Sequence, residues 1–307
     1  MNEAYRHQVR LLLDVLPLVA EEKVFALKGG TAINLFERDL PRLSVDIDLT
    51  YLPFDARDAA LAAISEALQR IRARIEKTVA KTRVTLVLQP GGLEAKLHCQ
   101  RGRVQIKIEV NPTLRGHLMP TRLMSCTARV QDEFEMFVET PVVSHGELFG
   151  GKICAALDRQ HPRDLFDVHL LLDAEGITDE VRFGFLAALI GHGRPINELL
   201  KPRPKDRREA FTGQFAGMSF AEFSYDNHEA TLTRLSEAIA AALTPDDKAF
   251  LLGFKNADPD WALFPFVEVA NLPAVQWKLS NLAMLKSDNP AKHIQSLQAL
   301  QTKLCIA

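Results

Sequence analysis

The chain has 307 residues, of which 47% are hydrophobic and 25% are charged, and its formal net charge at pH 7 is −2. This is the composition of a globular protein with its own core, and the charge argues against a wholesale basic nucleic-acid coat while leaving room for local basic patches. The four cysteines have neither CxxC nor metal-ligand spacing, and no apolar run approaches the ~20 residues of a membrane span. We therefore expect a reduced, cytoplasmic protein without a membrane partner.

The N-terminal part alternates helix and strand patterns. After an amphipathic helix that includes residues 11–20, we expect a strand over 24–28, a helix over 31–37, a strand over 45–52 and a long helix over 55–77. Three strand-like segments follow at 83–89, 93–100 and 103–110, joined by turns at residues 90–92 and 101–102 that are typical of hairpins. These patterns predict an α+β fold with a mixed sheet and one or two covering helices.

From about residue 144 onward the sequence has almost only helical periodicity. The expected helices cover residues 145–158, 163–174, 179–191, 227–242, 246–253 and 270–287. The change of pattern predicts one domain over residues 1–143 and a helical domain over residues 144–307. The basic, proline-broken segment over residues 194–208 is expected to be an exposed connection.

A double glycine marks the junction between the first strand and the next helix. Gly29 and Gly30 would leave backbone N–H groups free at the positive end of the helix dipole, an arrangement that suits a phosphate group. Double glycines are also common as simple helix entries. The dinucleotide and P-loop fingerprints are both absent from the sequence.

Two aspartates stand two residues apart on the following strand. Asp46 and Asp48 therefore lie on one face of the sheet, opposite the apolar Ile47 and Leu49. Two carboxylates ~4 Å apart repel by roughly 4 kcal/mol at an effective dielectric constant of about 20. A counter-ion or a helix N-terminus is expected nearby, and Mg²⁺, which prefers oxygen ligands, would relieve the repulsion.

A third carboxylate is expected from the strand over residues 104–111. Its alternation places Ile106 and Ile108 inward and Lys107 and Glu109 on the other face. If this strand neighbours the aspartate strand, Glu109 completes a cluster that can bind one or two Mg²⁺ ions. The alternative is a surface Lys–Glu pair.

The helical part carries a second charged motif. Lys152 and Arg159 share one helix face, and Asp164 and Asp167 lie one turn apart on the next helix, which Pro162 begins. In one interpretation Arg159 and Arg163 pair with the two aspartates and fix the helices together. In the other, Lys152 is a point charge for nucleotide phosphates and the acidic residues orient it.

In combination, these motifs resemble the AbiEii/AbiGii nucleotidyltransferases, the toxins of type IV toxin–antitoxin and abortive-infection systems. The resemblance covers residues 25–172 and rests on GGTA, the DxD strand, KIEV and K-x-x-A-A-x-x-R-x-x-x-R-D-x-x-D. It implies the polymerase-β-like nucleotidyltransferase fold, followed by a helical C-terminal domain that completes the active-site cleft.

The resemblance also implies the chemistry, namely Mg²⁺-dependent transfer of a nucleotide from an NTP to an acceptor, which in some members is the tRNA 3′ end. A separate antitoxin gene product is implied, without a stable complex. The implied residues are Gly29, Gly30 and Thr31 for the triphosphate, Asp46 and Asp48 for the metals, and Lys152 and Asp167 for the last motif. Ser44 and Arg163 are added as candidate substrate-binding residues.

Two alternatives stay open at this point. One is a nucleotidyltransferase that modifies an antibiotic or another small molecule, and the other is a catalytically silent nucleotide-binding or interaction module. Basic residues that could contact RNA phosphates gather in two places, at residues 70–83 and at residues 201–208. Each group could equally be a solvated surface.

Overall fold

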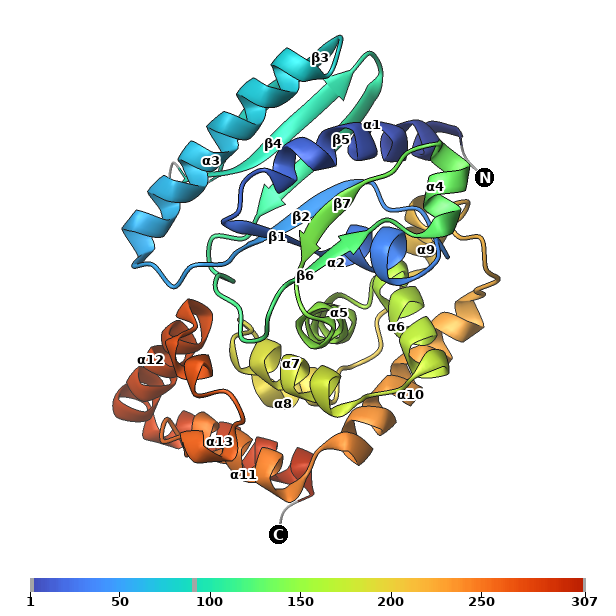
Figure 1. The fold of residues 1–307 in the computed structure, drawn as a ribbon. Coiled ribbons are helices and arrows are strands. Elements are labelled where there is room, and N and C mark those ends of the chain that lie inside the picture. Colours follow the sequence, from blue (N-terminus) through green and yellow to red (C-terminus); the bar gives the residue numbers. More distant parts are fainter. Residues whose placement is uncertain (1–2, 90–92, 306–307) are drawn as a thin grey trace. The chain divides into compact units, whose positions relative to one another are not determined.

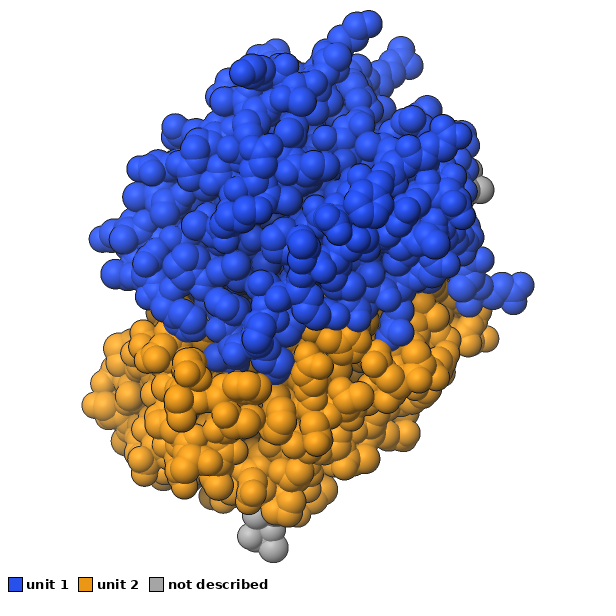
Figure 2. Space-filling model, in the orientation of Figure 1, with its two compact units in different colours: residues 1–144, 215–222 blue, residues 145–214, 223–307 orange. Residues whose placement is uncertain are grey.

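The computed structural model describes residues 3–89 and 93–305 and divides into two compact units (Figure 2). The first unit holds residues 1–144 and 215–222, and the second holds residues 145–214 and 223–307. The chain therefore crosses between the units after residues 144, 214 and 222. The division expected from the sequence, after residue 143, did not include the return of residues 215–222.

Seven strands of the first unit form one mixed sheet (Figure 1). β2 pairs in parallel with β5, and β1 with β7, while the other neighbouring pairs are antiparallel. In order across the sheet the strands are β3 (Thr82–Gln89), β4 (Leu93–Arg101), β5 (Val104–Val110), β2 (Asp46–Tyr51), β1 (Phe25–Lys28), β7 (Glu139–Val142) and β6 (Arg122–Ser125).

The predicted mixed sheet and α+β class are confirmed. β3, β4 and β5 are joined in antiparallel order as expected, although the turn predicted at residues 90–92 lies outside the described residues. Gly102, in the second turn, has a φ of +62°, a left-handed conformation that favours glycine. The sequence did not predict β6, β7 or the helix α4 (Ala128–Phe134) near them.

Two long helices, α1 (Glu3–Ala20) and α3 (Arg57–Thr78), pack on the sheet and on each other (Figure 1). The apolar stripe of α1 is completely buried at Leu12 and Leu16. Glu22, just after α1, accepts hydrogen bonds from Arg70 at 2.8 Å and from Arg74 at 2.6 Å. These contacts join the end of α1 to α3.

The helix that follows β1 starts earlier than expected. α2 (Gly29–Ala32) includes both glycines and continues into the π-helical turn η1 (Ile33–Glu37), whereas the sequence predicted a start at Thr31. The glycines are therefore the first turn of the helix rather than a loop before it.

The second unit is helical (Figure 1). None of the helices in the described residues is both long and apolar enough to cross a membrane. The helices are α5 (His145–Arg159), α6 (Pro162–Ala174), α7 (Asp179–Ile190), α8 (Ile196–Leu200), α9 (Arg208–Gln214), α10 (Tyr225–Ala242), α11 (Pro245–Lys255), α12 (Pro273–Asp288) and α13 (Pro290–Leu304), with 3₁₀ turns η2 (Trp261–Leu263) and η3 (Val267–Asn271).

Most of these helices match the expected ranges, but the segment over residues 194–208 does not. It was expected to be an exposed connection, yet its first half forms α8, in which Ile196 and Leu199 are buried. Ile196 and Leu199 are three residues apart and so lie on one face of a single helical turn. The prolines on either side of this turn made the segment resemble a coil in the sequence. Residues 201–207 have no helix or strand and are mostly exposed, and Arg208 begins α9.

α5 and α7 approach each other backbone to backbone through glycines. A Cβ atom at Gly150 would collide with the backbone of Gly184, and one at Gly184 would collide with the backbone of Gly146. At Gly151, the next residue of α5, a Cβ atom would meet nothing within 4 Å.

This contrast predicts opposite effects of two neighbouring substitutions. We expect Gly150→Ala to destabilise the second unit by about 1–3 kcal/mol, because the helices must move apart. Gly151→Ala is expected to be neutral or to stabilise by about 0.5–1 kcal/mol, since alanine is the better helix former. Urea unfolding followed by tryptophan fluorescence measures both, because Trp261 and Trp277 lie in this unit. Equal effects of the two variants would contradict the close packing.

Candidate active site

Asp46 and Asp48 lie on the central strand β2, whose parallel neighbour β5 brings two further charges beside them. The register places Lys107 next to Asp46 and Glu109 next to Asp48. All four side chains are half-buried, while Ile47 and Ile108 are fully buried on the opposite face. The predicted neighbouring of the two strands is therefore confirmed.

Lys107 supplies a positive charge next to the aspartates. Its ammonium lies 3.0 Å from a Glu109 carboxylate oxygen, and Lys96 of β4 lies 3.4 Å from the same oxygen. Burial alone would lower the pKa of Lys107, but the hydrogen bond to Glu109 and the charges of Asp46, Glu109 and Asp48 outweigh it and raise that pKa. Part of the repulsion between the aspartates is thus relieved by the protein itself.

The predicted cluster of three carboxylates is not gathered here. Across residues 3–89 and 93–305, no group of three or more His, Cys, Asp or Glu side chains is placed to hold a metal ion. The physical reason is that Glu109 pairs with Lys107 and Lys96. A role for Glu109 as a metal ligand stays a prediction.

The glycine turn closes against one of the aspartates. Gly29 has a φ of +74°, and a Cβ atom there would lie 2.6 Å from Asp48 Oδ2. The preceding Lys28 is the register partner of Asp48 across β1 and β2, so strand pairing brings the start of α2 to this carboxylate. Only glycine combines this conformation with this close approach.

The second glycine faces a buried arginine that sequence reasoning missed. A Cβ atom at Gly30 would lie 2.8 Å from Arg42 Nη2 and 3.0 Å from Ser44 Oγ. Arg42 is only 2% exposed and donates a hydrogen bond to the Leu43 carbonyl at 2.9 Å. Arg42 precedes Ser44, Asp46 and Asp48 at steps of two residues, and this alternation is the signal that could have found it.

Thr31 and Ser44 join the glycine helix to the aspartate strand. The Thr31 hydroxyl donates to the Asp46 carbonyl and lies 3.1 Å from the Ser44 hydroxyl, and both side chains are buried. Their hydroxyls therefore hold the frame of the turn. Their predicted contacts with a triphosphate stay predictions.

Residues 215–222, hereafter the return arm, cover the loop that leads into β2. The Leu43 N–H donates to the Met218 carbonyl at 2.8 Å, and the Phe220 N–H donates to the Pro41 carbonyl at 2.9 Å. Met218 is itself buried. The arm thus fixes the main chain on either side of Arg42.

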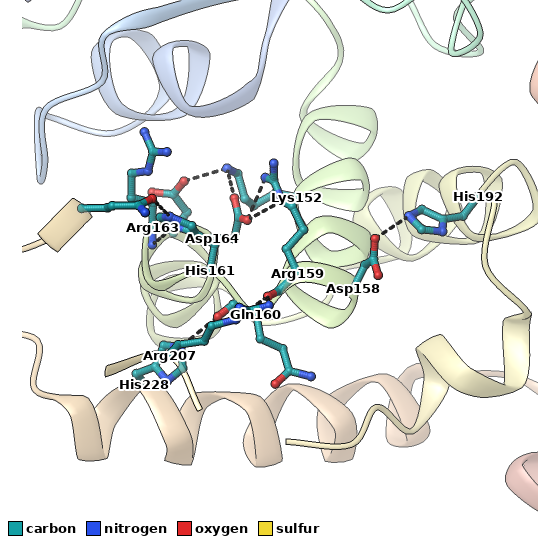
Figure 3. Close-up of polar contacts among 12 residues, drawn as sticks. Lys152, Asp158, Arg159, Gln160, His161, Arg163, Asp164, His192, Arg207 and His228 are labelled. Carbon is teal, nitrogen blue, oxygen red and sulfur yellow. Dashed lines mark hydrogen bonds and ion pairs between the residues drawn. The ribbon is translucent and has the colours of Figure 1, made fainter. Parts of the chain in front are cut away.

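The second charged set lies on α5 and α6 of the other unit (Figure 3). Lys152 is buried, and its ammonium lies 2.9 Å from Asp164 and 3.1 Å from Asp167. Arg159 donates to the second oxygen of Asp164 at 3.0 Å and 2.7 Å. Burial alone would raise the pKa of Asp164, but the charges of Lys152 and Arg159 lower it to about 2.

This pairing fits parts of both interpretations of the motif, since the ion pairs join α5 to α6 and also fix the Lys152 ammonium. The structural one expected Arg159 and Arg163 to pair with the aspartates, but Lys152 takes the place of Arg163. The Arg163 guanidinium extends away from the ion pairs in Figure 3, and its backbone N–H donates to His161 Nδ1 at 3.2 Å, which caps α6. Lys152 is oriented by acidic residues, as the functional interpretation expected.

Removal of the lysine leaves two buried carboxylates without their counter-charge. We expect Lys152→Met to lower the free energy of unfolding at pH 7 by about 3–5 kcal/mol, compared with a negligible loss in the exposed Lys201→Met. Because the pKa of Asp164 is lower in the folded state, this network contributes fully above about pH 4 and its contribution is lost as the pH falls towards 2. Urea unfolding across this pH range tests both statements, and a Lys152→Met loss no larger than that of Lys201→Met would contradict them.

Known proteins resemble this chain in sequence and in fold. The family model for the nucleotidyl transferase AbiEii toxin of type IV toxin–antitoxin systems matches residues 10–281. No curated protein matches the chain. Among solved structures, the nucleotidyltransferase toxin MenT4 from Mycobacterium tuberculosis H37Rv is similar in fold, with a TM-score of 0.57 and 16% identity over 91% of this chain and 97% of that chain. Since the family model spans most of its length, the chain belongs to the AbiEii family of nucleotidyl transferase toxins of type IV toxin–antitoxin systems.

Proposed function

We propose that this nucleotidyltransferase moves a nucleotide from an NTP to an acceptor hydroxyl, with the tRNA 3′ end as the acceptor, and thereby inhibits growth. The observation that carries the chemistry is the closure of a helix-opening glycine turn on Asp48, with Asp46 on the same face of β2. The tRNA acceptor rests on the resemblance of the sequence motifs to the AbiEii/AbiGii nucleotidyltransferases.

The reaction forms a bond between the acceptor oxygen and the α-phosphorus of the NTP and breaks the bond from that phosphorus to the leaving pyrophosphate. We propose that the first-turn N–H groups of α2, at Gly29 and Gly30, bind the phosphates, because these positions have no partner within a helix. Thr31 and Ser44 hold that turn in place, and Arg42 lies beside Gly30. Arg42 places a positive charge beside Gly30, and Asp48 places a negative charge beside Gly29.

The oxygen donors of Asp46 and Asp48 fit Mg²⁺, and we propose that they hold one or two ions. Bound there, Mg²⁺ would neutralise phosphate charge and favour ionisation of the attacking hydroxyl. Burial alone would raise the pKa of Glu109, but the hydrogen bond and charge of Lys107, and then Lys96, lower it. A carboxylate with a lowered pKa is a weak base, so Glu109 suits an ion better than a proton.

Lys152, Asp167 and Arg163 are proposed to serve the same reaction from the second unit. Lys152 is held between Asp164 and Asp167, and Arg163 presents a guanidinium, the side chain best shaped for phosphate oxygens. In this proposal the second unit completes the active-site cleft. The partner that controls the toxin is a separate antitoxin gene product, with no stable complex required.

The decisive measurement is transfer of label to RNA. Purified protein is incubated with Mg²⁺, each α-³²P-labelled NTP in turn, and total bacterial RNA, beside Asp46→Asn and a matched Asp58→Asn variant. Asp58 is an exposed aspartate of α3 whose side chain is 97% accessible. We expect one NTP to label a tRNA-sized band, with the signal lost in Asp46→Asn and kept in Asp58→Asn.

Other outcomes have distinct meanings. Label in small molecules instead of RNA would favour the antibiotic-modifying alternative. Absence of label everywhere, with growth inhibition intact in Asp46→Asn, would favour a catalytically silent module and overturn the proposal.

A second prediction concerns the contact between Gly29 and Asp48. Gly29→Ala and Gly102→Ala both place alanine at a positive φ, so each is expected to cost about 1–2 kcal/mol of stability. Only at Gly29 does the new Cβ atom meet a carboxylate, whereas at Gly102 it meets nothing within 4 Å. We therefore expect nucleotide transfer to fall at least tenfold in Gly29→Ala and to persist in Gly102→Ala, compared at equal folded fractions. Equal activities would show that the glycine–aspartate contact does not matter for transfer.

A further inference from the structure

The structure treats the two basic clusters of the sequence differently. In the cluster around α3, carboxylates neutralise the arginines: Arg70 and Arg74 pair with Glu22 at 2.8 Å and 2.6 Å, and Arg72 pairs with Glu76 at 3.4 Å. Glu21 adds a further pair to Arg74 at 3.3 Å. Little positive charge is left over for a polyanion at Arg70, Arg72 and Arg74, although Lys77, Lys81 and Arg83 of the same cluster are exposed.

The other cluster, residues 201–208, is hereafter the basic strap. It has five cationic side chains and a single carboxylate, Asp206, which pairs with Arg208 at 3.5 Å. Lys201, Arg203 and Arg208 are exposed. Within the part of the chain that the structure describes, no carboxylate lies within ion-pair distance of Lys201 or Arg203.

A buried glutamine fixes the main chain of the strap. Gln160 follows α5 and is 1% exposed, and its side-chain amide donates to the Arg203 carbonyl at 2.8 Å while its oxygen accepts from the Lys205 N–H at 2.7 Å. The Gln160 carbonyl in turn lies 3.1 Å from His228 Nε2. The strap is therefore held through its backbone groups, as an extended strand is. This leaves the Arg203 side chain available to contact a ligand.

Two cations of the strap attach it to the last turn of α5, and one of them, Arg207, is drawn in Figure 3. Lys205 donates to the Asp158 carbonyl at 2.6 Å, and Arg207 donates to the Arg159 carbonyl at 2.8 Å and 3.0 Å. Cations are favourable at the negative end of a helix dipole, so these contacts fix the side chains without removing their charge. The strap is ordered and still positive.

The positive surface continues onto the motif of α5 and α6. Arg159 pairs with Asp164, yet 62% of its side chain is accessible, and Arg163 lies on the first turn of α6 with its guanidinium directed away from the ion pairs (Figure 3). Arg208 lies with its guanidinium 4.5 Å from the Tyr225 ring centre, which fixes the end of the strap.

We propose that the basic strap, together with Arg159 and Arg163, is the surface that binds the phosphate backbone of the RNA acceptor. The proposal rests on the proposed function, because it names where that acceptor is held. A solubilising loop needs no buried glutamine to fix its main chain, whereas a phosphate-binding surface gains affinity when its charges are ordered beforehand. No aromatic side chain of the strap itself is available for base stacking, because residues 201–208 contain none. The strap would therefore contact the phosphate backbone of the RNA rather than its bases.

Binding of tRNA to the full-length protein, without NTP, tests this surface. Fluorescence anisotropy over a salt series compares the wild type with Arg203→Gln, Arg208→Gln and the double variant. Each lost phosphate contact is expected to weaken binding at low salt and to reduce the slope of log K against log salt by roughly 0.7–0.9. Arg70→Gln and Arg72→Gln, whose side chains pair with carboxylates in the other cluster, are the matched controls and are expected to change neither quantity.

The outcomes separate this proposal from the proposed function. In the labelling assay, the strap variants are expected to raise the KM for RNA at least threefold with kcat unchanged. An unchanged slope and KM in the double variant, or an equal loss in the controls, would overturn the strap while leaving nucleotide transfer intact. Strap-dependent RNA binding without any label in RNA would support the strap as an RNA surface and count against the tRNA-directed reaction.

Discussion

The pairing of β2 with both of its neighbours is the constraint on which the candidate site depends. β1 runs antiparallel to β2 with Lys28 opposite Asp48, and β5 runs parallel to it with Glu109 opposite the same residue. Main-chain hydrogen bonds therefore place a helix start on one side of Asp48 and a lysine–glutamate pair on the other. A slip of one residue would turn the aspartates to the buried face. The fully buried Ile47 and Ile108 prevent that slip, so core packing and site geometry are set by one register.

The two charged sets balance their charge to different degrees. Beside the aspartates, Lys107 supplies a counter-charge from a half-buried position. In the second unit, Lys152 is almost completely buried between Asp164 and Asp167, and its position there is fixed. A buried ion pair is weak evidence for stability because desolvation offsets the attraction. The desolvation cost of burying Lys152 is consistent with the proposed role in nucleotide transfer, which requires its ammonium to be held at one position.

How far the sequence predicts the structure depends on the strength of each local pattern. β5 was predictable because Ile106, Ile108 and Val110 alternate without interruption, whereas β6 and β7 have four residues each and β7 contains Pro141. The start of α2 was misjudged because glycines read as a break, while here a left-handed Gly29 opens the helix. The sequence pattern does not predict which side chains pair with one another. Spacing alone cannot show that Lys152 is buried and Arg163 is not, nor that Arg42 lies against Gly30. The kinds of charged motif could be predicted from the sequence. Which of their side chains pair with one another depends on tertiary packing.

The return arm has a consequence for how the chain is made. The first unit cannot be completed when residue 144 has been synthesised, since residues 215–222 form part of it and cover the loop before β2. Seventy-eight further residues, from 145 to 222, must first be translated. The main chain on either side of Arg42 therefore gains its hydrogen bonds to the return arm only after α5, α6 and the basic strap have been synthesised. This order ties completion of the first unit to the synthesis of the helices and the basic strap that precede the return arm.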